Sequence, residues 1–521
     1  MKLMSSAQMR EMDRYVIEDM GVSGVVLMTN AAEHVAAAAL ERLPMGSRAA
    51  VFCGTGNNGG DGIGAAAILM EKGVPLRTFL IGNEEKLTPD SKEMLSRLKT
   101  AGGTLEPFAA SDEIIEYLSG CYVIIDAIFG IGLNTDLRGD ALLAAGMINN
   151  ARQCLLYSDK YTSVHPYVIA ADIPSGVQAD TGEILGDSVL ADMTVTFSAA
   201  KYGHFIEPGC TRCGELRARD IGIPRDIVSN ADSSVFAVMR DSVNLPQRQP
   251  DSHKGSYGRL LIVAGSVGYT GAPALSARAA SRMGAGLVHL GVPQPIYEIM
   301  AAKLNEEMPF PLPSDKHGRL NLKAGEEILR RAAVCGALLL GPGLGRSKEI
   351  TELVLTIIKT VKAPIVLDAD GLNAIAGNLG ILNKSASPLI LTPHPGEFMR
   401  LGGDTTSGNR LQVAREFATK RGCVLVLKGH RTITALPDGT VYINTTGGPA
   451  MAKGGSGDVL AGMIASLIVQ KFPLNEAVTI ASYIHGLAGD LCADEYGEYS
   501  VVAGDIIDML PKAARSVALR D

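Results

Sequence analysis

The first of two glycine-rich segments in the chain, GTGNNGGDG at residues 54–62, lies between the apolar run 49–53 and a helix that we expect to begin near Ile63. Such a turn exposes backbone N–H groups at a helix N-terminus, and only small side chains allow a phosphate group to approach them. Five glycines in nine residues therefore predict a site for a phosphate-bearing ligand. A turn required only for tight strand-to-helix packing is the alternative, and fewer glycines would suffice for it.

The glycine spacing in this segment formally matches the dinucleotide-binding pattern GxGxxG at Gly54, Gly56 and Gly59. In dinucleotide-binding dehydrogenases, an acidic residue about 20 positions later binds the ribose. The corresponding stretch in this chain, VPLRTFLIG at 74–82, has no acidic residue. The sequence therefore disfavours ordinary NAD-dehydrogenase chemistry.

Polar side chains also follow later strands that we expect in the first half of the chain. Asp126 precedes FGIGLNTD at 129–136, and Asp172 precedes IPSG at 173–176. In an open parallel sheet, ligands bind beyond the carboxyl ends of the strands. We therefore expect these two strand ends and the first glycine-rich segment to converge on one crevice.

Asn58, Asp126 and Ser175 would bring hard oxygen donors into this crevice. Such donors suit an alkali or alkaline-earth cation. Each of these residue types, taken alone, is more often a helix cap or a turn former. The set of three predicts a cation site more strongly than any one of its members does.

The second glycine-rich segment, NTTGGPAMAKGGSGDVLAG at 444–462, places Gly454, Gly455 and Gly457 directly before Asp458 and an apolar helix. Backbone N–H groups at the helix start would stabilise a charged phosphoryl group, and the carboxylate would take a proton from the attacking hydroxyl. The Walker A pattern GxxxxGK[ST] is absent from this segment. A simple helix cap is the alternative, because aspartate is favourable in the first turn of a helix.

Three further strand ends in the second half carry polar residues: GPGLG (341–345), TPHPGEF (392–398) and KGHRT (428–432). Lys428 and His430 could reach nucleotide phosphates. A single histidine is often structural, so that His394 and His430 could each either bind a ligand or serve only the fold. Asp368 and Asp370 in VLDADGLNA either cap the end of the sheet or lie near a metal, and the sequence leaves this choice open.

Apolar runs of strand length alternate with amphipathic stretches of helix length. In the first half the runs are 49–53, 76–81, 122–128, 167–171 and 193–197. In the second half they are 259–264, 287–291, 337–340, 364–368, 389–392 and 424–427. This alternation is typical of α/β folds with parallel sheets covered by helices on both faces. Because 521 residues exceed one core and a proline-bearing polar segment separates the halves, we expect domains at 1–230 and 231–521.

Composition and charge exclude several classes of protein. With 46% hydrophobic and 20% charged residues and no three-residue glycine period, the chain is neither disordered nor collagen-like. A net charge of −7 and a pI near 5.8 argue against a nucleic-acid partner. Charged residues at 10–14 interrupt the apolar core that a signal peptide needs, and no apolar run approaches the roughly 18–20 residues of a membrane span. The eight scattered cysteines, with one CxxC pair, suggest reduced thiols, and we expect a cytoplasmic protein.

The segments GTGNNGGDG, VIIDAIFGIGLNTDLRG and ADIPSG resemble the NAD(P)H-hydrate epimerase family, and the similarity covers about residues 5–225. The resemblance implies a Rossmann-like three-layer fold that binds a hydrated nicotinamide dinucleotide and a potassium ion. It implies that Asn58, Asp126 and Ser175 hold the potassium, and that Asp172 contacts the substrate and is the best-placed acid or base. It implies that two loops bind the substrate through Asn57, Asn58, Gly59, Gly60, Asp61, Gly130, Ile131, Gly132, Leu133, Asn134, Thr135 and Asp136.

The second half, from DSHKGSYGRLLIVAGS to about residue 515, resembles the ADP- or ATP-dependent NAD(P)H-hydrate dehydratase family. The resemblance implies a ribokinase-like three-layer domain with Asp458 as the catalytic residue at the reacting hydroxyl. It implies a dinucleotide site lined by Ala272, Gly345, His394 and Asp458. It implies an adenine-nucleotide site formed by Lys428, Gly429, His430, Arg431, Thr432 and Gly457.

Together the two resemblances imply a bifunctional enzyme that repairs hydrated NADH and NADPH, called NADHX and NADPHX. The hydrated ring carries a hydroxyl on C6 in an R or an S form. The N-terminal half would interconvert the two forms, and the C-terminal half would dehydrate the S form. That dehydration would convert ADP to AMP, or ATP to ADP, with release of phosphate. We expect Asp458 to deprotonate the C6 hydroxyl as it attacks the terminal phosphate, with Mg²⁺ neutralising the nucleotide.

Two alternatives stay open at this point. The C-terminal half could instead be a kinase for a vitamin precursor or a sugar alcohol, because the same anion hole serves that reaction. The N-terminal half could be a non-catalytic dinucleotide-binding module. The partners that we expect are these small molecules, without nucleic acid or membrane, and we expect a homo-oligomer.

Overall fold

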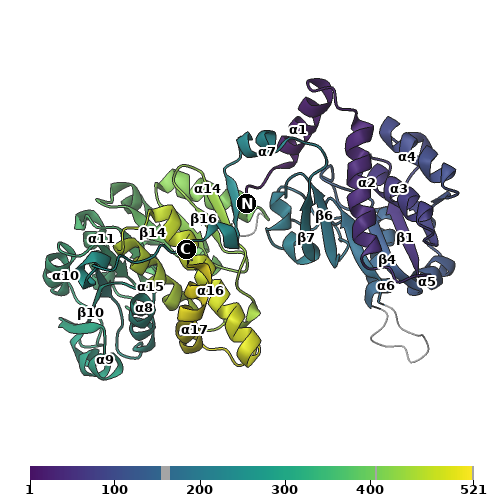
Figure 1. Cartoon of the computed structure of the whole chain (residues 1–521). Helices are drawn as coiled ribbons and strands as arrows, with labels where there is room; N and C mark the ends of the chain where they lie inside the picture. Colours follow the sequence, from purple (N-terminus) through teal and green to yellow (C-terminus); the bar gives the residue numbers. More distant parts are fainter. Residues whose placement is uncertain (154–164, 405–407, 519–521) are drawn as a thin grey trace. The chain divides into compact units, whose positions relative to one another are not determined.

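The computed structural model describes residues 1–153, 165–404 and 408–518. The chain divides into two compact units, Lys2–Val235 and Phe236–Asp521, and Met1 belongs to the second (Figure 1). We call them the N-terminal and the C-terminal domain and describe each by itself. In the described part of the chain, no helix is long and apolar enough to cross a bilayer.

A parallel sheet forms the middle layer of the N-terminal domain. Its strands are β1 (Arg48–Cys53), β2 (Leu76–Leu80), β3 (Leu105–Pro107), β4 (Cys121–Ala127), β5 (Tyr167–Ala171), β6 (Met193–Phe197) and β7 (Glu215–Arg219). Among the described residues their order is β3-β2-β1-β4-β5-β6-β7, and each neighbouring pair runs parallel. The order reverses between β1 and β4, and a crevice forms at the carboxyl ends of strands where this happens.

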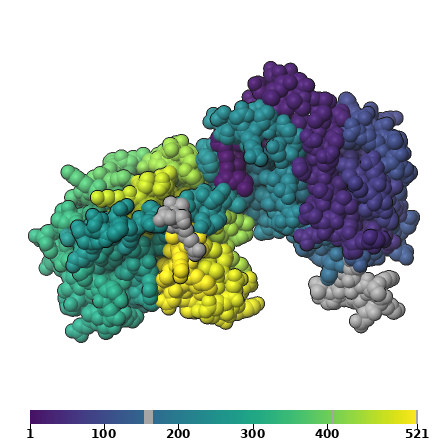
Figure 2. All heavy atoms as spheres, viewed as in Figure 1, coloured from purple at the N-terminus to yellow at the C-terminus, as the bar shows by residue number. Residues whose placement is uncertain are grey.

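Alternate residues of these strands face two separate hydrophobic clusters. Val51 and Ile125 belong to the cluster of α1 (Ser6–Glu18), α2 (Gly24–Leu40), α3 (Asn57–Glu71), α4 (Pro89–Thr100) and α7 (Arg225–Asn230). Phe52 and Ile124 belong to the cluster of α5 (Asp112–Ser119) and α6 (Gly139–Gln153). The domain therefore has three layers. The purple segment with α1 and α2 forms part of the outer surface of this domain (Figure 2).

The C-terminal domain contains a longer sheet of mixed direction. Its strands are β8 (Val235–Val238), β9 (Arg259–Val263), β10 (Leu287–Pro293), β11 (Met308–Leu312), β12 (Ala337–Leu340), β13 (Ile365–Leu367), β14 (Leu389–Leu391), β15 (Val424–Leu427), β16 (Ile433–Ala435) and β17 (Val441–Asn444). Over the described ranges the order is β11-β10-β9-β12-β13-β14-β15-β16-β17-β8. The pairs from β11 to β15 are parallel, whereas β15, β16 and β17 pair antiparallel.

Helices cover this second sheet on both faces as well. Ile262 and Leu339 pack in the cluster of α8 (Gly271–Arg282), α9 (Tyr297–Lys303), α15 (Ser456–Val469), α16 (Leu474–Tyr496) and α17 (Ala503–Val517). The alternate residues Leu261 and Leu338 point the other way and are fully buried. The remaining helices are α10 (Ala324–Ala332), α11 (Lys348–Thr360), α12 (Asp370–Ile375), α13 (Pro395–Arg400) and α14 (Arg410–Arg421). Of these, α10 contacts β9, and α14 contacts β15 and β16.

The predicted fold class of two three-layer α/β domains is confirmed, and every predicted apolar run contains a strand. The strands that the sequence analysis missed lie toward the edges of the sheets. Strand β7 reads ELRAR and is largely exposed, so that it lacks an apolar run. Strands β16 and β17 are only three and four residues long, and their antiparallel pairing was not expected.

Helix α15 packs on α8 so closely that position 462 has no room for a side chain. A Cβ on Gly462 would lie 2.2 Å from the carbonyl oxygen of Ser276. We expect Gly462→Ala to lower the free energy of unfolding of the C-terminal domain by about 1–3 kcal/mol in urea denaturation, because the helices must move apart. The matched control is Gly504→Ala in α17, where a Cβ would meet no atom within 4 Å. Equal stability of both variants would contradict this account.

Candidate functional site

The first glycine-rich segment enters its helix earlier than predicted: α3 begins at Asn57 and not near Ile63. The glycines allow the helix start to pack on the ends of two strands. A Cβ on Gly59 would lie 1.8 Å from the carbonyl oxygen of Gly54, and a Cβ on Gly54 would lie 2.0 Å from that of Ile128. The low helix propensity of glycine made this turn look like a loop, but tertiary packing determines its structure.

A cavity of about 600 Å³ lies at the carboxyl ends of β1, β4, β5 and β6. The predicted substrate residues that line it are Asn57, Asn58, Asp61, Gly130, Ile131, Gly132, Leu133 and Asp172. Within the described residues, the other predicted ones, Gly59, Gly60, Asn134, Thr135 and Asp136, do not line it. The cavity thus unites the three strand ends that the sequence analysis expected to converge.

Asp172 and Lys201 form a buried ion pair in this cavity, with Nζ of Lys201 2.5 Å from Oδ1 of Asp172. The ammonium also donates hydrogen bonds to the hydroxyl of Thr196 at 2.8 Å and to the carbonyl oxygen of Phe197 at 3.3 Å. Burial opposes the ionisation of Asp172, but the charge of Lys201 outweighs it and lowers the pKa of this carboxyl. Burial lowers the pKa of His204 to about 3, so that its neutral ring donates from Nε2 to the carbonyl oxygen of Asp172 at 2.9 Å.

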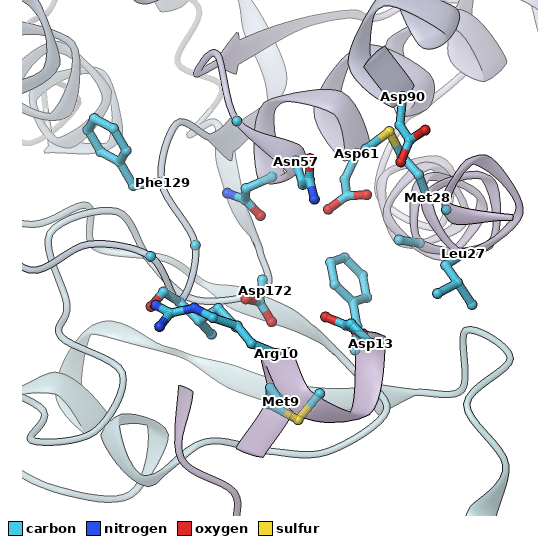
Figure 3. A pocket seen from close by; sticks show the side chains of 18 of the residues that line it. Met9, Arg10, Asp13, Leu27, Met28, Asn57, Asp61, Asp90, Phe129 and Asp172 are labelled. Atoms are coloured by element: carbon cyan, nitrogen blue, oxygen red, sulfur yellow. The ribbon is translucent and has the colours of Figure 1, made fainter. Parts of the chain in front are cut away.

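Besides Asp90 on α4, three further carboxyl groups line this cavity from three different elements (Figure 3). Asp13 comes from α1, Asp61 from α3, and Asp172 from the loop after β5. Burial raises the pKa of Asp61 well above its ordinary value, and the charges of Asp172 and Asp13 add to this. Burial also raises the pKa of Asp13 to about 6, with Lys201 opposing the shift. The one ammonium group of Lys201 therefore acts on the pKa of all three.

Sequence reasoning missed Lys201 and Asp13, although both left a signal. Lys201 follows the predicted strand 193–197, so that the strand-end rule would have found it. Asp13 lies four residues after Met9 on α1, next to the buried face that includes Met9 and Val16. A carboxylate beside a buried helix face is unusual and could have been singled out.

Two of the three predicted cation ligands, Asp126 and Ser175, are hydrogen-bonded to each other. Ser175 donates to Asp126 from its hydroxyl at 2.6 Å and from its backbone N–H at 2.8 Å. Burial raises the pKa of Asp126 to about 6, against the opposing effect of these hydrogen bonds. The side-chain amide of Asn58 is buried, and neither its oxygen nor its nitrogen has a hydrogen-bond partner among the described residues. The oxygen of Asn58 is therefore available for a ligand.

In the C-terminal domain, α15 begins directly after Gly455, whose φ of +98° is typical of glycine. Asp458 lies in the first turn of this helix, as predicted. The ammonium of Lys428 reaches the same turn, because a Cβ on Gly457 would lie 3.0 Å from its Nζ. The second glycine-rich segment thus brings backbone N–H groups, an ammonium and a carboxyl group together.

Asp368 holds Lys428 in this position. Nζ of Lys428 lies 2.8 Å from Oδ1 of Asp368, and the hydroxyl of Thr392 donates to the same oxygen at 2.8 Å. Burial raises the pKa of Asp458 to about 7; Asp368 and Glu397 reinforce this shift and Lys428 opposes it. Asp368 is therefore an ion-pair partner, which the sequence analysis left open.

Asp370 fixes a different loop. Its Oδ2 accepts a hydrogen bond at 2.9 Å from the backbone N–H of Gly345, in the segment GPGLG. In the same segment, a Cβ on Gly343 would lie 3.5 Å from that of Ala272. The structure thus brings the predicted dinucleotide residues Ala272 and Gly345 to one loop, which Asp370 supports.

The remaining residues of KGHRT form a turn before β16. Gly429 has a φ of +153° and Arg431 a φ of +55°. The hydroxyl of Thr432 donates to the carbonyl oxygen of Gly429 at 3.0 Å and stabilises the turn. His430 in this turn and His394 at the start of α13 are both exposed, so that solvent or a ligand can reach them.

We expect Lys201→Met to lower the stability of the N-terminal domain by about 3–5 kcal/mol at pH 7, because it leaves the buried carboxylate of Asp172 without its cation. The folded-state pKa of Asp172 lies below its unfolded value, so that the ion pair stabilises the fold above the unfolded pKa near 4 and this contribution is lost as the pH falls. Without Lys201, Asp172 is protonated as the pH falls, so that the loss of stability should shrink between pH 7 and pH 4 in urea denaturation. The exposed Lys99, paired with Glu84, gives the control Lys99→Met. An equal loss in both variants would show that the pair does not stabilise the domain.

Two family models match the chain. One, described as YjeF-related protein N-terminus, matches residues 24–203. The other, described as NAD(P)H-hydrate dehydratase, matches residues 260–512. A solved structure of ADP/ATP-dependent NAD(P)H-hydrate dehydratase from Bacillus subtilis is 32% identical and covers 54% of this chain and 99% of its own, with a TM-score of 0.47.

Relatives named bifunctional NAD(P)H-hydrate repair enzyme Nnr match over almost the full length. The one from Moorella thermoacetica is 38% identical over 99% of this chain and 97% of its own. The one from Thermofilum pendens is 37% identical over 99% of this chain and 97% of its own. The resemblance inferred from the glycine-rich segments is confirmed, and the chain belongs to the family of bifunctional NAD(P)H-hydrate repair enzymes.

Proposed function

We propose that this chain repairs hydrated NADH and NADPH at two sites, an epimerase in residues 1–230 and an ADP- or ATP-dependent dehydratase in residues 231–521. The observation that supports this best is a half-buried carboxyl group beside each glycine-rich segment. Burial raises the pKa of Asp13 beside the first segment to about 6, and that of Asp458 in the second to about 7. Groups with such pKa values transfer protons efficiently near neutral pH.

In the epimerase site, the loops 57–61 and 130–136 bind the dinucleotide. The start of α3 offers backbone N–H groups to its phosphates. Asp172 contacts the nicotinamide ring as an ionised carboxylate, because Lys201 keeps its pKa low. Substrate binding between these groups excludes water from the cavity and strengthens their electrostatic effect.

Potassium fits the site formed by Asn58, Asp126 and Ser175. Asp126 is a fully buried carboxyl that accepts hydrogen bonds from neutral donors, and the buried oxygen of Asn58 lacks a partner in the described part of the chain. A monovalent cation held by these oxygens would neutralise Asp126 and offer positive charge to the pyrophosphate of the substrate. The fold itself would hold these three ligand residues in place around the ion.

In the dehydratase site, Asp458 takes the proton of the C6 hydroxyl, and the oxygen attacks the terminal phosphorus of ADP or ATP. The bond from that phosphorus to the leaving AMP or ADP breaks. Gly457 and Lys428 stabilise the charge on the transferred group. The ring nitrogen then expels phosphate from C6, and loss of a proton from C5 restores the double bond. Phosphate is a much better leaving group than hydroxide.

Magnesium fits this site as the partner of the nucleotide phosphates. The ion binds proteins through one or two carboxylates and completes its shell with phosphate oxygens and water. The charges of Asp368, Glu397 and Asp458 together raise the pKa of Lys428 against the effect of its burial, so that the local negative charge would attract the ion. Bound magnesium would neutralise charge on the phosphates during transfer.

We also propose a homo-oligomeric, cytoplasmic protein, which size-exclusion chromatography and cell fractionation can test.

The direct test uses purified full-length protein with mixed NADHX epimers, with and without each nucleotide. We expect the absorbance of NADH to recover fully from both epimers when ADP or ATP is present. Recovery of the S fraction alone would count against the epimerase, and a stable phosphorylated product would indicate a kinase instead.

Asp458 must be ionised to accept a proton, and its pKa is about 7. We therefore expect the dehydration rate to rise with pH up to about pH 7 to 8 and then to level off. Asp458→Asn should lower kcat by about 10²- to 10⁴-fold and leave epimerisation unchanged. The control Asp508→Asn removes an exposed carboxylate of α17 that pairs with Arg278. Near wild-type dehydration by Asp458→Asn at saturating nucleotide would exclude this role.

A bound potassium ion stabilises the fold that binds it. At a potassium concentration ten times the Kd, we expect about 1.4 kcal/mol of added stability relative to choline chloride of equal ionic strength. Asn58→Ala should remove most of this difference, whereas Asn150→Ala on the exposed side of α6 should keep it. Thermal denaturation in the two salts measures the effect, and a potassium response that persists in Asn58→Ala would count against this site.

A further inference from the structure

We propose that Asp13, on helix α1, is a second acid–base residue of the epimerase and exchanges a proton with the C6 hydroxyl of one epimer, while Asp172 does so for the other. This inference rests on the proposed epimerase function. Inversion at C6 removes a hydroxyl from one face of the ring and adds one to the other. A single carboxyl group on one face could assist only one of these steps.

Helix α1 is fixed over the cavity in a way that presents Asp13 to a ligand. Arg10 donates to the carbonyl oxygen of Ile131 at 3.2 Å, and the hydroxyl of Ser6 donates to Asp180 at 2.6 Å. Asp13 lines the cavity, and its carboxyl makes no hydrogen bond or ion pair with any of the described residues. A carboxyl group that is half-buried and unbonded in a binding cavity is available to substrate.

Asp13 and Asp172 reach the cavity from different elements, a helix and the loop after a strand (Figure 3). Asp172 follows β5 of the central sheet, whereas Asp13 belongs to the helical layer above it. The proposed role requires the nicotinamide ring to lie between these two elements, with one carboxyl group on each face of the ring. The charged groups that face Asp13 are Lys201 after β6, Asp172 after β5 and Asp61 on α3.

The neighbouring Asp61 is less suited to this task. Burial raises the pKa of Asp61 well above its ordinary value, whereas the charge of Lys201 lowers the pKa of Asp172. Burial raises the pKa of Asp13 only to about 6, so that Asp13 can both give and take a proton near neutral pH.

The reaction balances with water as the second reactant. Protonated Asp13 gives its proton to the C6 hydroxyl, the C6–O bond breaks, and water leaves as the lone pair of N1 forms an N1=C6 iminium. A water molecule adds to the other face of C6, the π electrons return to N1, and the carboxylate of Asp172 takes the proton of that water. The attacking water becomes strongly acidic as it adds to the cation, so that even a weak base accepts its proton. The reverse reaction exchanges the two roles, and solvent resets the protons.

The test is Asp13→Asn in the full-length protein, with initial rates of R-to-S conversion corrected for the uncatalysed reaction. We expect kcat to fall at least about 100-fold, with little change in KM. In wild type, kcat should fall about tenfold per pH unit above pH 6 to 7, because Asp13 then loses its proton; Asp13→Asn should lack this limb. Asp13→Glu, which keeps an ionisable group, should retain part of the activity. The control Glu11→Gln removes an exposed carboxylate of the same helix and should match wild type.

Two further measurements distinguish a loss of epimerase chemistry from a loss of folding or of the dehydratase. Dehydration of the pure S epimer with ADP or ATP reports on the C-terminal domain, and circular dichroism reports on folding of each variant. In H₂¹⁸O, each interconversion by the wild type should place ¹⁸O on C6. Epimerisation without label, or Asp13→Asn activity within about threefold of wild type, would overturn the role of Asp13. Absence of any epimerisation by wild type would instead overturn the proposed function.

Discussion

One buried ammonium group among several carboxyl groups sets the chemistry of each domain. Lys201 pairs with Asp172 at 2.5 Å, and Lys428 pairs with Asp368 at 2.8 Å. The carboxyl groups that remain cannot all be balanced by one cation. Burial then raises their pKa values, to about 7 for Asp458. Acid–base groups suited to neutral pH therefore arise because the buried and half-buried carboxyl groups outnumber the lysines beside them. Aspartate side chains alone can then transfer protons near pH 7.

Close contact between backbones explains why glycine is so abundant, with 59 residues in the chain. In the C-terminal domain a Cβ on Gly341 would lie 1.9 Å from the carbonyl oxygen of Asp368, and one on Gly371 would lie 2.6 Å from that of Leu340. In both domains, adjacent strand ends approach each other until only glycine fits between them. The same contacts bring the polar side chains of neighbouring strand ends into one site, so that packing and function require the same glycines.

The fold and much of both sites could be predicted because local patterns encode them. Buried parallel strands are continuous apolar runs, and glycine-rich segments such as the one carrying Asp458 mark a site. Other features depend on contacts between distant parts of the chain. The start of α3 at Asn57 follows from packing against β4, and the approach of Asp13 to Lys201 joins a helix to a strand end far along the sequence. No local pattern reveals which distant residues come together. The sequence shows only that a charged residue lies beside a buried helix face and that another follows a strand end.

Asp126 and Asp172 show how neighbouring strand ends are used for different tasks. Both are buried carboxyls at the ends of β4 and β5, but Lys201 neutralises only Asp172 of the two. The Lys201 ammonium favours the ionised form of Asp172 before the reaction, as a group that accepts a proton requires. Asp126 accepts hydrogen bonds from Ser175 and needs a cation that can enter and leave, which is what the proposed potassium ion provides. The fixed ammonium of Lys201 thus lies beside Asp172, where the proton is transferred. The exchangeable potassium ion would lie beside Asp126, where the charged substrate has to bind.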